Sequence, residues 1–232
     1  MITLMHPLLV SRIVLTQDAP TILTVEHPDT LTSLVQDLHA QTNNETGGFQ
    51  LCEDLKPVNI AKELSLVHSP FALDFEQRKL LTRIQTDLNQ LSMSPEHYQS
   101  TATIQTALQN YLHELECDYT IPLQWDVEIC AANIAKAANL SIMTDGLSLP
   151  ERILLFLQAA TTLKLARFFV FVHLRPFLTP KQLRNLFYEA RLKKYCLMLI
   201  EAKDMPRCDA AERRLTLDAD LCEIANDFAD MK

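Results

Sequence analysis

Two residues near the carboxyl end of the chain could bind and use a divalent metal. The apolar run "YCLMLI" leads directly into Glu201-Ala202-Lys203. Many metal-dependent nucleases carry Glu-x-Lys at the end of a strand, where the glutamate holds the ion and the lysine assists the chemistry. That arrangement also needs an acid on a neighbouring strand, and the preceding apolar run "RFFVFVHL" has none. A DNA-processing nuclease that uses Glu201 and Lys203 is one hypothesis, and an ordinary solvated strand end is the other.

A phosphate-binding loop is missing where a nucleotide fold would carry it. The first apolar strand pattern, "TILTV", is followed by "EHPDTLTSLV", which has no glycine and no Gly-Lys-Thr. A P-loop needs glycines whose backbone amides converge on phosphate, together with a lysine. The glutamate at the start of this segment would repel phosphate, and the whole chain has 3 glycines. We therefore predict that the protein binds no nucleotide.

Other catalytic and structural signatures are also missing from the sequence. The 7 histidines are isolated from one another, and no Gly-x-Ser-x-Gly motif occurs. The 6 cysteines form no Cys-x-x-Cys pair, which indicates reduced, packed thiols in a cytoplasmic protein. No apolar run reaches the roughly 20 residues of a membrane helix, and the first ten residues lack the pattern of an export signal.

The elements around these segments indicate an α/β fold. Alternating apolar residues predict two strands around the Asp18-Ala19-Pro20 turn, and residues 31–38 have the spacing of a helix. Towards the carboxyl end, two almost entirely apolar strand patterns alternate with helical patterns, as expected for parallel strands covered on both faces. We expect the amino-terminal and carboxyl-terminal thirds to build one sheet. The later patterns are a helix over 150–165, a strand over 167–174, a helix over 180–194 and a strand over 195–202.

The middle of the chain is helical in pattern. Ser69-Pro70 could start a first helix and Ser94-Pro95 restarts it, so the turn between them predicts an antiparallel helical hairpin. A third helical pattern covers residues 126–140. The predicted organisation is an α/β head formed by residues 1–67 and 144–232, with an α-helical leg inserted at residues 68–143.

Charge is distributed unevenly along this acidic chain. The formal net charge is −8, which on its own disfavours nucleic-acid binding. Residues 160–214, however, hold 12 Lys or Arg and 5 Asp or Glu, whereas the remainder holds 9 and 24. A basic third is thus attached to an acidic rest.

Three long segments carry a resemblance to a known family. They are "GGFQLCEDLKPVNIAKELSLVHSPFALDFEQRKLLTRI", "FFVFVHLRPFLTPKQL" and "RRLTLDADLCEIANDF". Together they resemble the small non-integrase adaptation protein of type II-A CRISPR–Cas systems. The resemblance covers nearly the whole chain in the same order, is weaker between residues 89 and 147, and depends on the combined pattern because no single motif is catalytic.

The resemblance implies a fold and a function that can be tested. It implies a degenerate P-loop-like α/β head without a nucleotide site, a projecting helical leg, and a homotetramer that forms a ring. The ring would bind double-stranded DNA at an end, without catalysis, during spacer acquisition. Calcium would hold the ring in shape, and the partners would include the CRISPR integrase complex and the type II effector nuclease.

An acidic cluster near the end of the helical hairpin is where this resemblance would place calcium. Calcium takes six to eight oxygen ligands, largely carboxylates and carbonyls. Pro122 breaks the segment, so its acids could fold back toward one another, and no EF-hand motif is present. A solvated acidic edge is the alternative. The candidate ligands are Glu114, Glu116, Asp118, Asp126 and Glu128.

Lysine and arginine would meet the phosphates of DNA with little sequence preference. The sequence has no basic strand interleaved with aromatic residues and no recognition helix. Some candidates are isolated positive positions in acidic surroundings, and the others lie in the basic third near helix ends. They are Lys56, Lys62, Lys136, Lys164, Lys181 and Arg184.

The missing phosphate cradle gives a first prediction. ATP should not bind measurably, because no run of glycine amides and no P-loop lysine follows the first strand. Calorimetric titration of the protein with ATP should give only heat of dilution. A micromolar binding isotherm would contradict the prediction and restore the nucleotide-binding hypothesis.

Overall fold

The chain divides into two compact units. The computed structural model describes residues 1–124 and 130–226. The head unit comprises Met1–Asp74 and Thr144–Lys232, and the helical unit comprises Phe75–Met143. Sequence patterns placed the first boundary after residue 67. In the structure it falls after Asp74, because the linking segment belongs to the head through Leu73, which is 6% exposed.

The head contains two sheets. One is a six-stranded sheet in the order β10-β9-β3-β8-β7-β6, in which all neighbours are parallel except β10 and β9. The other is a four-stranded antiparallel sheet in the order β2-β1-β4-β5. The strands of the larger sheet are β3 (Thr21–Val25), β6 (Leu64–Val67), β7 (Phe168–Val172), β8 (Cys196–Glu201), β9 (Arg213–Leu217) and β10 (Glu223–Asn226). Those of the smaller sheet are β1 (Ile2–Met5), β2 (Ile13–Leu15), β4 (Gln50–Glu53) and β5 (Lys56–Val58).

The predicted fold class, an α/β head with an inserted helical unit, is confirmed, but the expectation of one sheet is only partly right. The two strands predicted around residues 18–20 both form, yet β2 joins the smaller sheet and β3 the larger. A strand at Ile2–Met5 was not predicted, and the segment after residue 212 forms β9 and β10. β3 still lies beside β8 and β9, so the two ends of the chain do share the six-stranded sheet.

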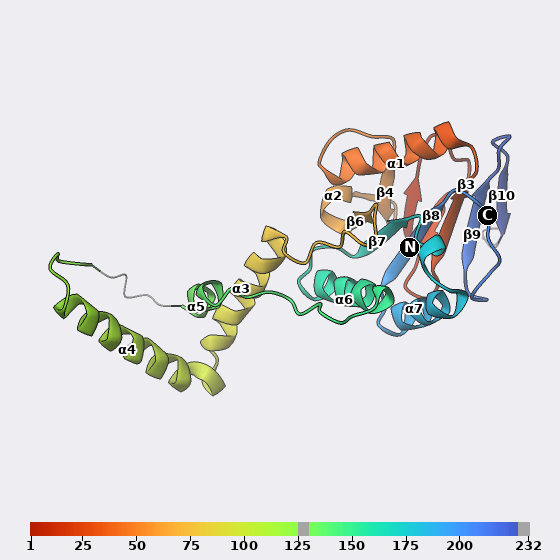
Figure 1. Cartoon of the computed structure of the whole chain (residues 1–232). Coiled ribbons are helices and arrows are strands. Elements are labelled where there is room, and N and C mark those ends of the chain that lie inside the picture. The colour runs from red at the N-terminus through yellow and green to blue at the C-terminus, as the bar shows by residue number, and fades with distance from the viewer. Residues whose placement is uncertain (125–129, 227–232) are drawn as a thin grey trace. The chain divides into compact units, whose positions relative to one another are not determined.

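Helices cover both faces of the larger sheet (Figure 1). On one side lie α1 and α2, and on the other lie α6 and α7. Capping boxes fix where the latter two begin: Ser148 with Glu151, and Thr179 with Gln182. The bounds are α1 Pro28–Thr42, α2 Ile60–Glu63, α6 Leu149–Thr162 and α7 Pro180–Leu192, with a 3₁₀ turn at Arg175–Phe177.

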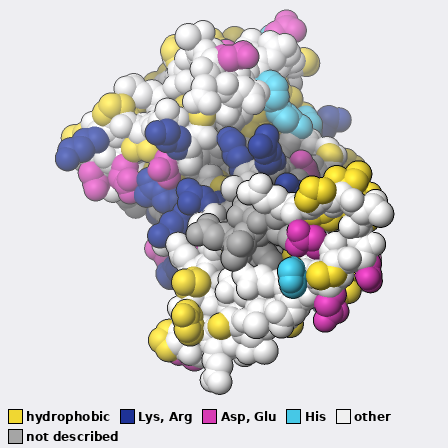
Figure 2. Space-filling model, turned by 90° about the vertical axis from the view of Figure 1, so that its left-hand side faces the viewer, with side chains coloured by type: hydrophobic (Ala, Val, Ile, Leu, Met, Phe, Trp, Pro, Cys, Tyr) yellow, Lys and Arg dark blue, Asp and Glu magenta, His cyan; other side chains and the backbone are white. Residues whose placement is uncertain are grey.

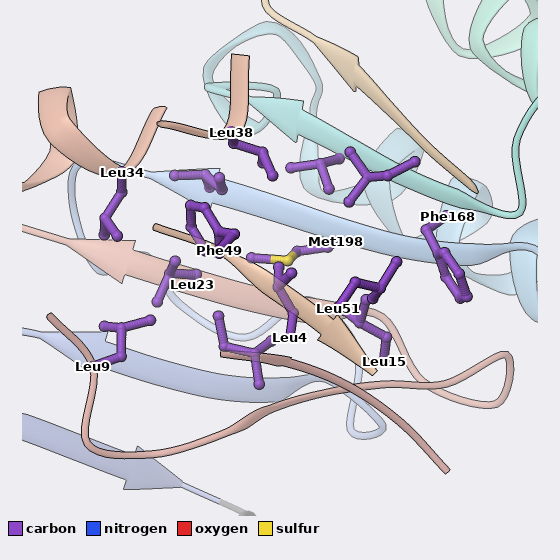
Figure 3. Packing of buried hydrophobic residues seen from close by; sticks show 14 of the residues in the cluster. Leu4, Leu9, Leu15, Leu23, Leu34, Leu38, Phe49, Leu51, Phe168 and Met198 are labelled. Atoms are coloured by element: carbon purple, nitrogen blue, oxygen red, sulfur yellow. The ribbon is translucent and has the colours of Figure 1, made fainter. Parts of the chain in front are cut away.

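Strand residues alternate between two cores. Phe168 and Val170 belong to the cluster shared with α1 and the smaller sheet, which Figure 3 shows around Leu34, Leu38 and Met198. Phe169, from the same strand, instead contacts the ring of Phe156 in α6, at 6.3 Å between centroids. This period of two is what a strand buried on both faces requires. Each fully buried Leu or Phe contributes about 1.5–3 kcal/mol relative to exposure.

The helical unit differs from the predicted hairpin. Its helices are α3 (Arg78–Ser92), α4 (Pro95–Cys117) and α5 (Ala131–Ala137). The break at Ser94-Pro95 is where the sequence placed it, but α3 starts at Arg78 rather than near Ser69. The two long helices diverge from their turn (Figure 1), and α4 buries none of its residues. An antiparallel hairpin is therefore wrong for this chain.

Helix α3 packs against α5 instead of α4. The N–H of Ala132 donates to the Asn89 side-chain oxygen at 2.7 Å, which joins the start of α5 to the end of α3. Lys136 and Leu140 then line one hollow with residues from the start of α3, so the two helices run in opposite directions. The described residues include no helix that is long and apolar enough to cross a membrane.

Several helices end on a non-glycine residue with left-handed backbone. Their φ values lie between 53° and 64°, a range that glycine normally occupies. The residue follows the last helical turn in each case, so it closes the helix in the manner of a C′ glycine. These residues are Asn44 after α1, Asn139 after α5, Lys164 after α6 and Lys194 after α7.

Candidate functional site

The connection from β3 to α1 is where an α/β fold of this type would hold a phosphate. Only Glu26 and His27 separate the two elements. The N–H of Glu26 donates to the carbonyl of Leu217 at 2.9 Å, so the sheet already uses it. Pro28 opens α1 without an N–H, and Asp29 adds a negative charge to its first turn. This end of α1 therefore lacks the glycine amides and the lysine of a P-loop, and it carries acids where phosphate would bind.

The Glu201 carboxylate is part of the head interior. Glu201 is 2% exposed, and its Oε1 accepts the N–H of Arg175 at 2.9 Å, at the start of the 3₁₀ turn. Burial raises the pKa of this carboxyl, while the N–H groups of Arg175 and Leu174 and the Arg175 charge lower it. Lys203 is exposed. Glu201 thus caps a turn and does not present an open face to a metal ion, as the nuclease hypothesis would require.

The acids at the end of α4 are in reach of solvent. Glu114 and Asp118 are exposed, and they are one helical turn apart, so they share a face. Glu116 is half-buried and lies 3.4 Å from the His113 ring nitrogen, on another side of the helix. Asp118 is the C-cap residue of α4, where a negative charge opposes the helix dipole.

These acids fit calcium by chemistry but not by number. Carboxylate oxygens are suitable ligands, yet calcium needs six to eight oxygens. Among residues 1–124 and 130–226, no group of three His, Cys, Asp or Glu side chains is arranged to hold a metal. The other two candidates, Asp126 and Glu128, lie outside the described residues. The described acids of one chain therefore do not form a calcium site by themselves.

The six candidate DNA-binding residues are all exposed, and the five that belong to the head lie on different sides of it. Lys56 lies on β5 and Lys62 on α2, whereas Lys181 and Arg184 lie on α7, which covers the opposite face of the sheet (Figure 1). Lys164 follows α6 at a φ of 54°. The Nε of Arg184 donates to the carbonyl of Cys208 at 3.0 Å, so part of its guanidinium is already occupied.

Lys136, a candidate from the sequence, lies beside three further bases of the helical unit that the sequence patterns did not identify. Arg78, Lys79 and Arg83 are exposed along the start of α3, and Lys136 is exposed on the adjacent α5. Arg78 and Lys136 line the same hollow, which has a volume of about 450 Å³. None of the four forms an ion pair with another residue in the described part of the chain. The spacing of "RKLLTR" on one helix was the available signal.

A helix start is an unusual place for these bases. The first turn of α3 holds no acid, although a helix N-terminus favours negative charge. Arg78 and Lys79 therefore repel the positive end of their own helix. A bound anion would relieve that repulsion, because it would meet both side chains and the helix N-terminus.

Much of the positive charge in the basic third is neutralised by ion pairs. Arg191 pairs with Asp209 at 2.7 Å. Arg214 lies 3.0 Å from Asp204 and also pairs with the buried Glu212. Arg167 pairs with Glu53 of β4 and Glu63 of α2. Asp204, Asp209 and Glu212 already belong to the acids of residues 160–214, so among these pairs only those of Arg167 lower the charge excess of the segment.

Comparisons with known proteins find one matching family and several similar solved structures. A family model described as "CRISPR-associated protein (Cas_Csn2)" matches residues 24–221. A search of curated proteins finds no match. The crystal structure of Stu0660 of Streptococcus thermophilus matches with a TM-score of 0.57 and 11% identity, covering 93% of this chain and 74% of that one. A nucleotide-free ATP-binding cassette from an ABC transporter matches with a TM-score of 0.45 and 14% identity, over 94% and 83% of the chains.

The buried Glu201 gives a prediction about pH. Its raised pKa means that the folded state holds a proton that the unfolded chain releases above the ordinary value of 4.5. Wild-type stability should therefore fall, relative to Glu201→Gln, as pH rises from about 4.5 through the folded-state pKa. The amide oxygen of Gln can still accept the Arg175 N–H. Urea unfolding of both proteins between pH 4.5 and 7.5 measures the difference.

The control for this prediction is Glu45→Gln, which removes an exposed carboxylate. Its unfolding free energy should run parallel to that of the wild type over the same interval. If the Glu201→Gln curve also runs parallel, the carboxyl titrates alike in the folded and unfolded states, and the prediction is wrong.

Proposed function

The chain belongs to the Csn2 family of CRISPR-associated proteins, which makes it a protein of CRISPR adaptation, and we propose that it is a non-catalytic ring that binds the ends of double-stranded DNA during spacer acquisition. The ring is a homotetramer that works in the cytoplasm. It acts with the CRISPR integrase complex and the type II effector nuclease. It uses neither nucleotide nor membrane.

The observation that carries DNA binding is the group of unpaired bases on the helical unit. Arg78 and Lys136 share a hollow, and Lys79 and Arg83 extend the positive surface along α3. Their side chains can meet phosphates without breaking an ion pair within the described residues. Contacts of this kind recognise the backbone of the duplex rather than its bases. The other five exposed candidates are proposed as further DNA contacts: Lys56, Lys62, Lys164, Lys181 and Arg184.

Assembly into a ring is supported by the surface of α4. No residue of this 23-residue helix is buried. Ile104, Tyr111 and Leu115 are at least 45% exposed and recur at helical spacing on one side. Hydrophobic side chains are visible on the surface of the protein in Figure 2. A long helix with unburied apolar residues needs a partner, and a second copy of the chain in the tetramer supplies one.

A non-catalytic role is supported by the β3–α1 connection and by the surroundings of Glu201. The β3–α1 connection is two residues long and carries an acid at its start. The Glu201 carboxylate is buried beneath a turn. Neither arrangement presents a substrate with a nucleophile or an open metal position.

Calcium belongs to the proposal as the ion that keeps the ring assembled. Because the described acids of one chain are too few, further oxygens have to come from residues 125–129 or from another subunit. Carboxylates that meet without an ion would repel one another. Calcium dependence is therefore linked to assembly and not to any reaction step.

The DNA-binding proposal predicts a salt-sensitive and end-dependent interaction. A linear fragment should bind, and the same fragment covalently closed into a circle should bind poorly, because a closed ring has to be threaded from an end. Affinity should fall with salt by a slope of about 0.9 per phosphate contact. Arg78→Ala/Lys136→Ala should weaken binding and reduce the slope by at least about one. Fluorescence anisotropy with labelled duplexes measures both.

The matched control is Lys193→Ala/Lys194→Ala, which removes two exposed charges from the head, one of them already paired with Asp18. It should leave the salt slope unchanged. Equal affinity for linear and closed circular DNA, with the oligomer intact, would rule out threading. A normal salt slope in Arg78→Ala/Lys136→Ala would move the DNA surface elsewhere.

The assembly proposal predicts a mass that depends on calcium. Light scattering should give a tetramer with calcium and smaller species after chelation. Glu116→Ala/Asp118→Ala should weaken assembly at limiting calcium, because it removes candidate ligands. Asp87→Ala/Asp145→Ala changes the charge equally at exposed positions and should assemble normally. Unchanged mass and calcium binding in the first variant would exclude these two acids as ligands.

A further inference from the structure

Two histidines from separate elements of the head meet at its surface. His39 lies in the last turn of α1, and His68 follows the last residue of β6. The Nδ1 of His39 and the Nε2 of His68 are 2.9 Å apart. The rings lie edge to face, with 4.8 Å between their centroids. Both residues are exposed, so solvent and ions can reach them.

The backbone beneath this pair is held by the core. Leu38, directly before His39, is fully buried, and Val67, directly before His68, is 7% exposed. Leu38 belongs to the main hydrophobic cluster, and Leu66 of β6 packs against that cluster. The two imidazoles are therefore brought together by the fold and do not depend on chance contact between mobile loops.

The spacing of the two nitrogens matches a metal chelate. An ion bound at about 2.0–2.1 Å by two imidazoles, at an angle near 90°, has its two nitrogens about 2.9 Å apart. We propose that His39 and His68 together chelate one transition-metal ion of the nickel and copper(II) class, whose neighbouring ligands lie at about 90°. In the described residues no third His, Cys, Asp or Glu completes the group, so water fills the other positions.

Binding requires a small change in the side chains. In the hydrogen-bonded pair the two nitrogens face each other, whereas in a chelate their lone pairs converge on a point beside them. The χ2 torsion of histidine is broad, and both rings are exposed, so each ring can turn to aim at that point. The donor ring of the pair gives up the proton on its ligating nitrogen and takes one up on its other nitrogen, so both imidazoles bind the ion in the neutral form.

Asn43 lies beside the second ring nitrogen of His39. The Asn43 amide nitrogen lies 3.4 Å from His39 Nε2 and donates to the His39 carbonyl at 3.1 Å. A ligating Nδ1 requires the proton on Nε2, which then needs an acceptor. A carboxylate at position 43 would be that acceptor, and carboxylates that receive the second N–H of a ligating histidine strengthen metal sites. Replacing Asn43 with Asp should therefore raise the affinity of the histidine pair for the metal ion.

The site is chemically distinct from the acids of α4. Imidazole nitrogen suits zinc, copper and nickel, whereas calcium and magnesium prefer oxygen. The inference therefore stands or falls independently of the proposed calcium-dependent ring. An ion at this site would link the end of α1 to the point where the chain leaves the large sheet on its way to the helical unit.

Nickel is the appropriate probe, because exposed thiols such as Cys117 would compete for zinc. Calorimetric titration with NiCl₂ at pH 8 and in excess calcium should show one site per chain. Either His39→Ala or His68→Ala should weaken it by about tenfold or more, since loss of a mere supporting residue already costs 10–100-fold. Asn43→Asp should tighten it. His97→Ala, an exposed histidine of α4, should leave it unchanged.

A second measurement uses the unaltered protein. Substoichiometric Ni²⁺ should broaden the proton NMR signals of two of the 7 histidines before the rest, and those two signals should be the ones lost in His39→Ala and His68→Ala. Uniform broadening, broadening that begins at His113 beside Glu116, or nickel affinity unaffected by both alanine variants would overturn the proposal.

Discussion

The buried carboxylate of Glu212 connects the loop before β9 with the first residues of β9 and with Arg175. The Glu212 side chain is fully buried and accepts the N–H groups of Cys208 and Asp209 at 2.8 and 3.0 Å. It also accepts the Arg214 Nε at 2.9 Å and lies 3.7 Å from Arg175. Removing one partner from such a network costs about 3–5 kcal/mol, because the remaining charge stays buried without compensation. The loop between β8 and β9, the 3₁₀ turn and the strand edge all depend on this single group.

The local parts of the fold could be predicted from the sequence, and the long-range parts could not. The restart at Ser94-Pro95 and the start of α7 at Thr179-Pro180 depend on neighbouring residues, so capping and proline chemistry reveal them. The assignment of β2 and β3 to different sheets depends on which strands pair across the head. Alternating apolar residues are compatible with either sheet, so no local pattern decides between them.

The candidate functional residues also depend on long-range contacts that the sequence does not reveal. Counting charges identified residues 160–214 as basic, but a count does not reveal that Arg167 is paired with Glu53 and Glu63, which are distant in sequence. The more accessible bases of α3 begin a helix in a part of the chain with no charge excess. The Glu-x-Lys motif likewise does not reveal that the Glu201 side chain is buried, because the same three residues can end an exposed strand or a covered one.

The left-handed residues that close the helices have an effect on the unfolded chain. Lys164 and Lys194 adopt a φ that costs a residue with a Cβ about 1–2 kcal/mol, and glycine would adopt it without that cost. Glycine, however, explores more conformations when the chain is unfolded, so it loses more entropy on folding. With 3 glycines in 232 residues, this protein has strained backbone in a few turns of the native state. Its unfolded chain explores fewer conformations than a chain with glycine at these positions, so it loses less entropy on folding. Each lysine also places a positive charge at the negative end of its helix.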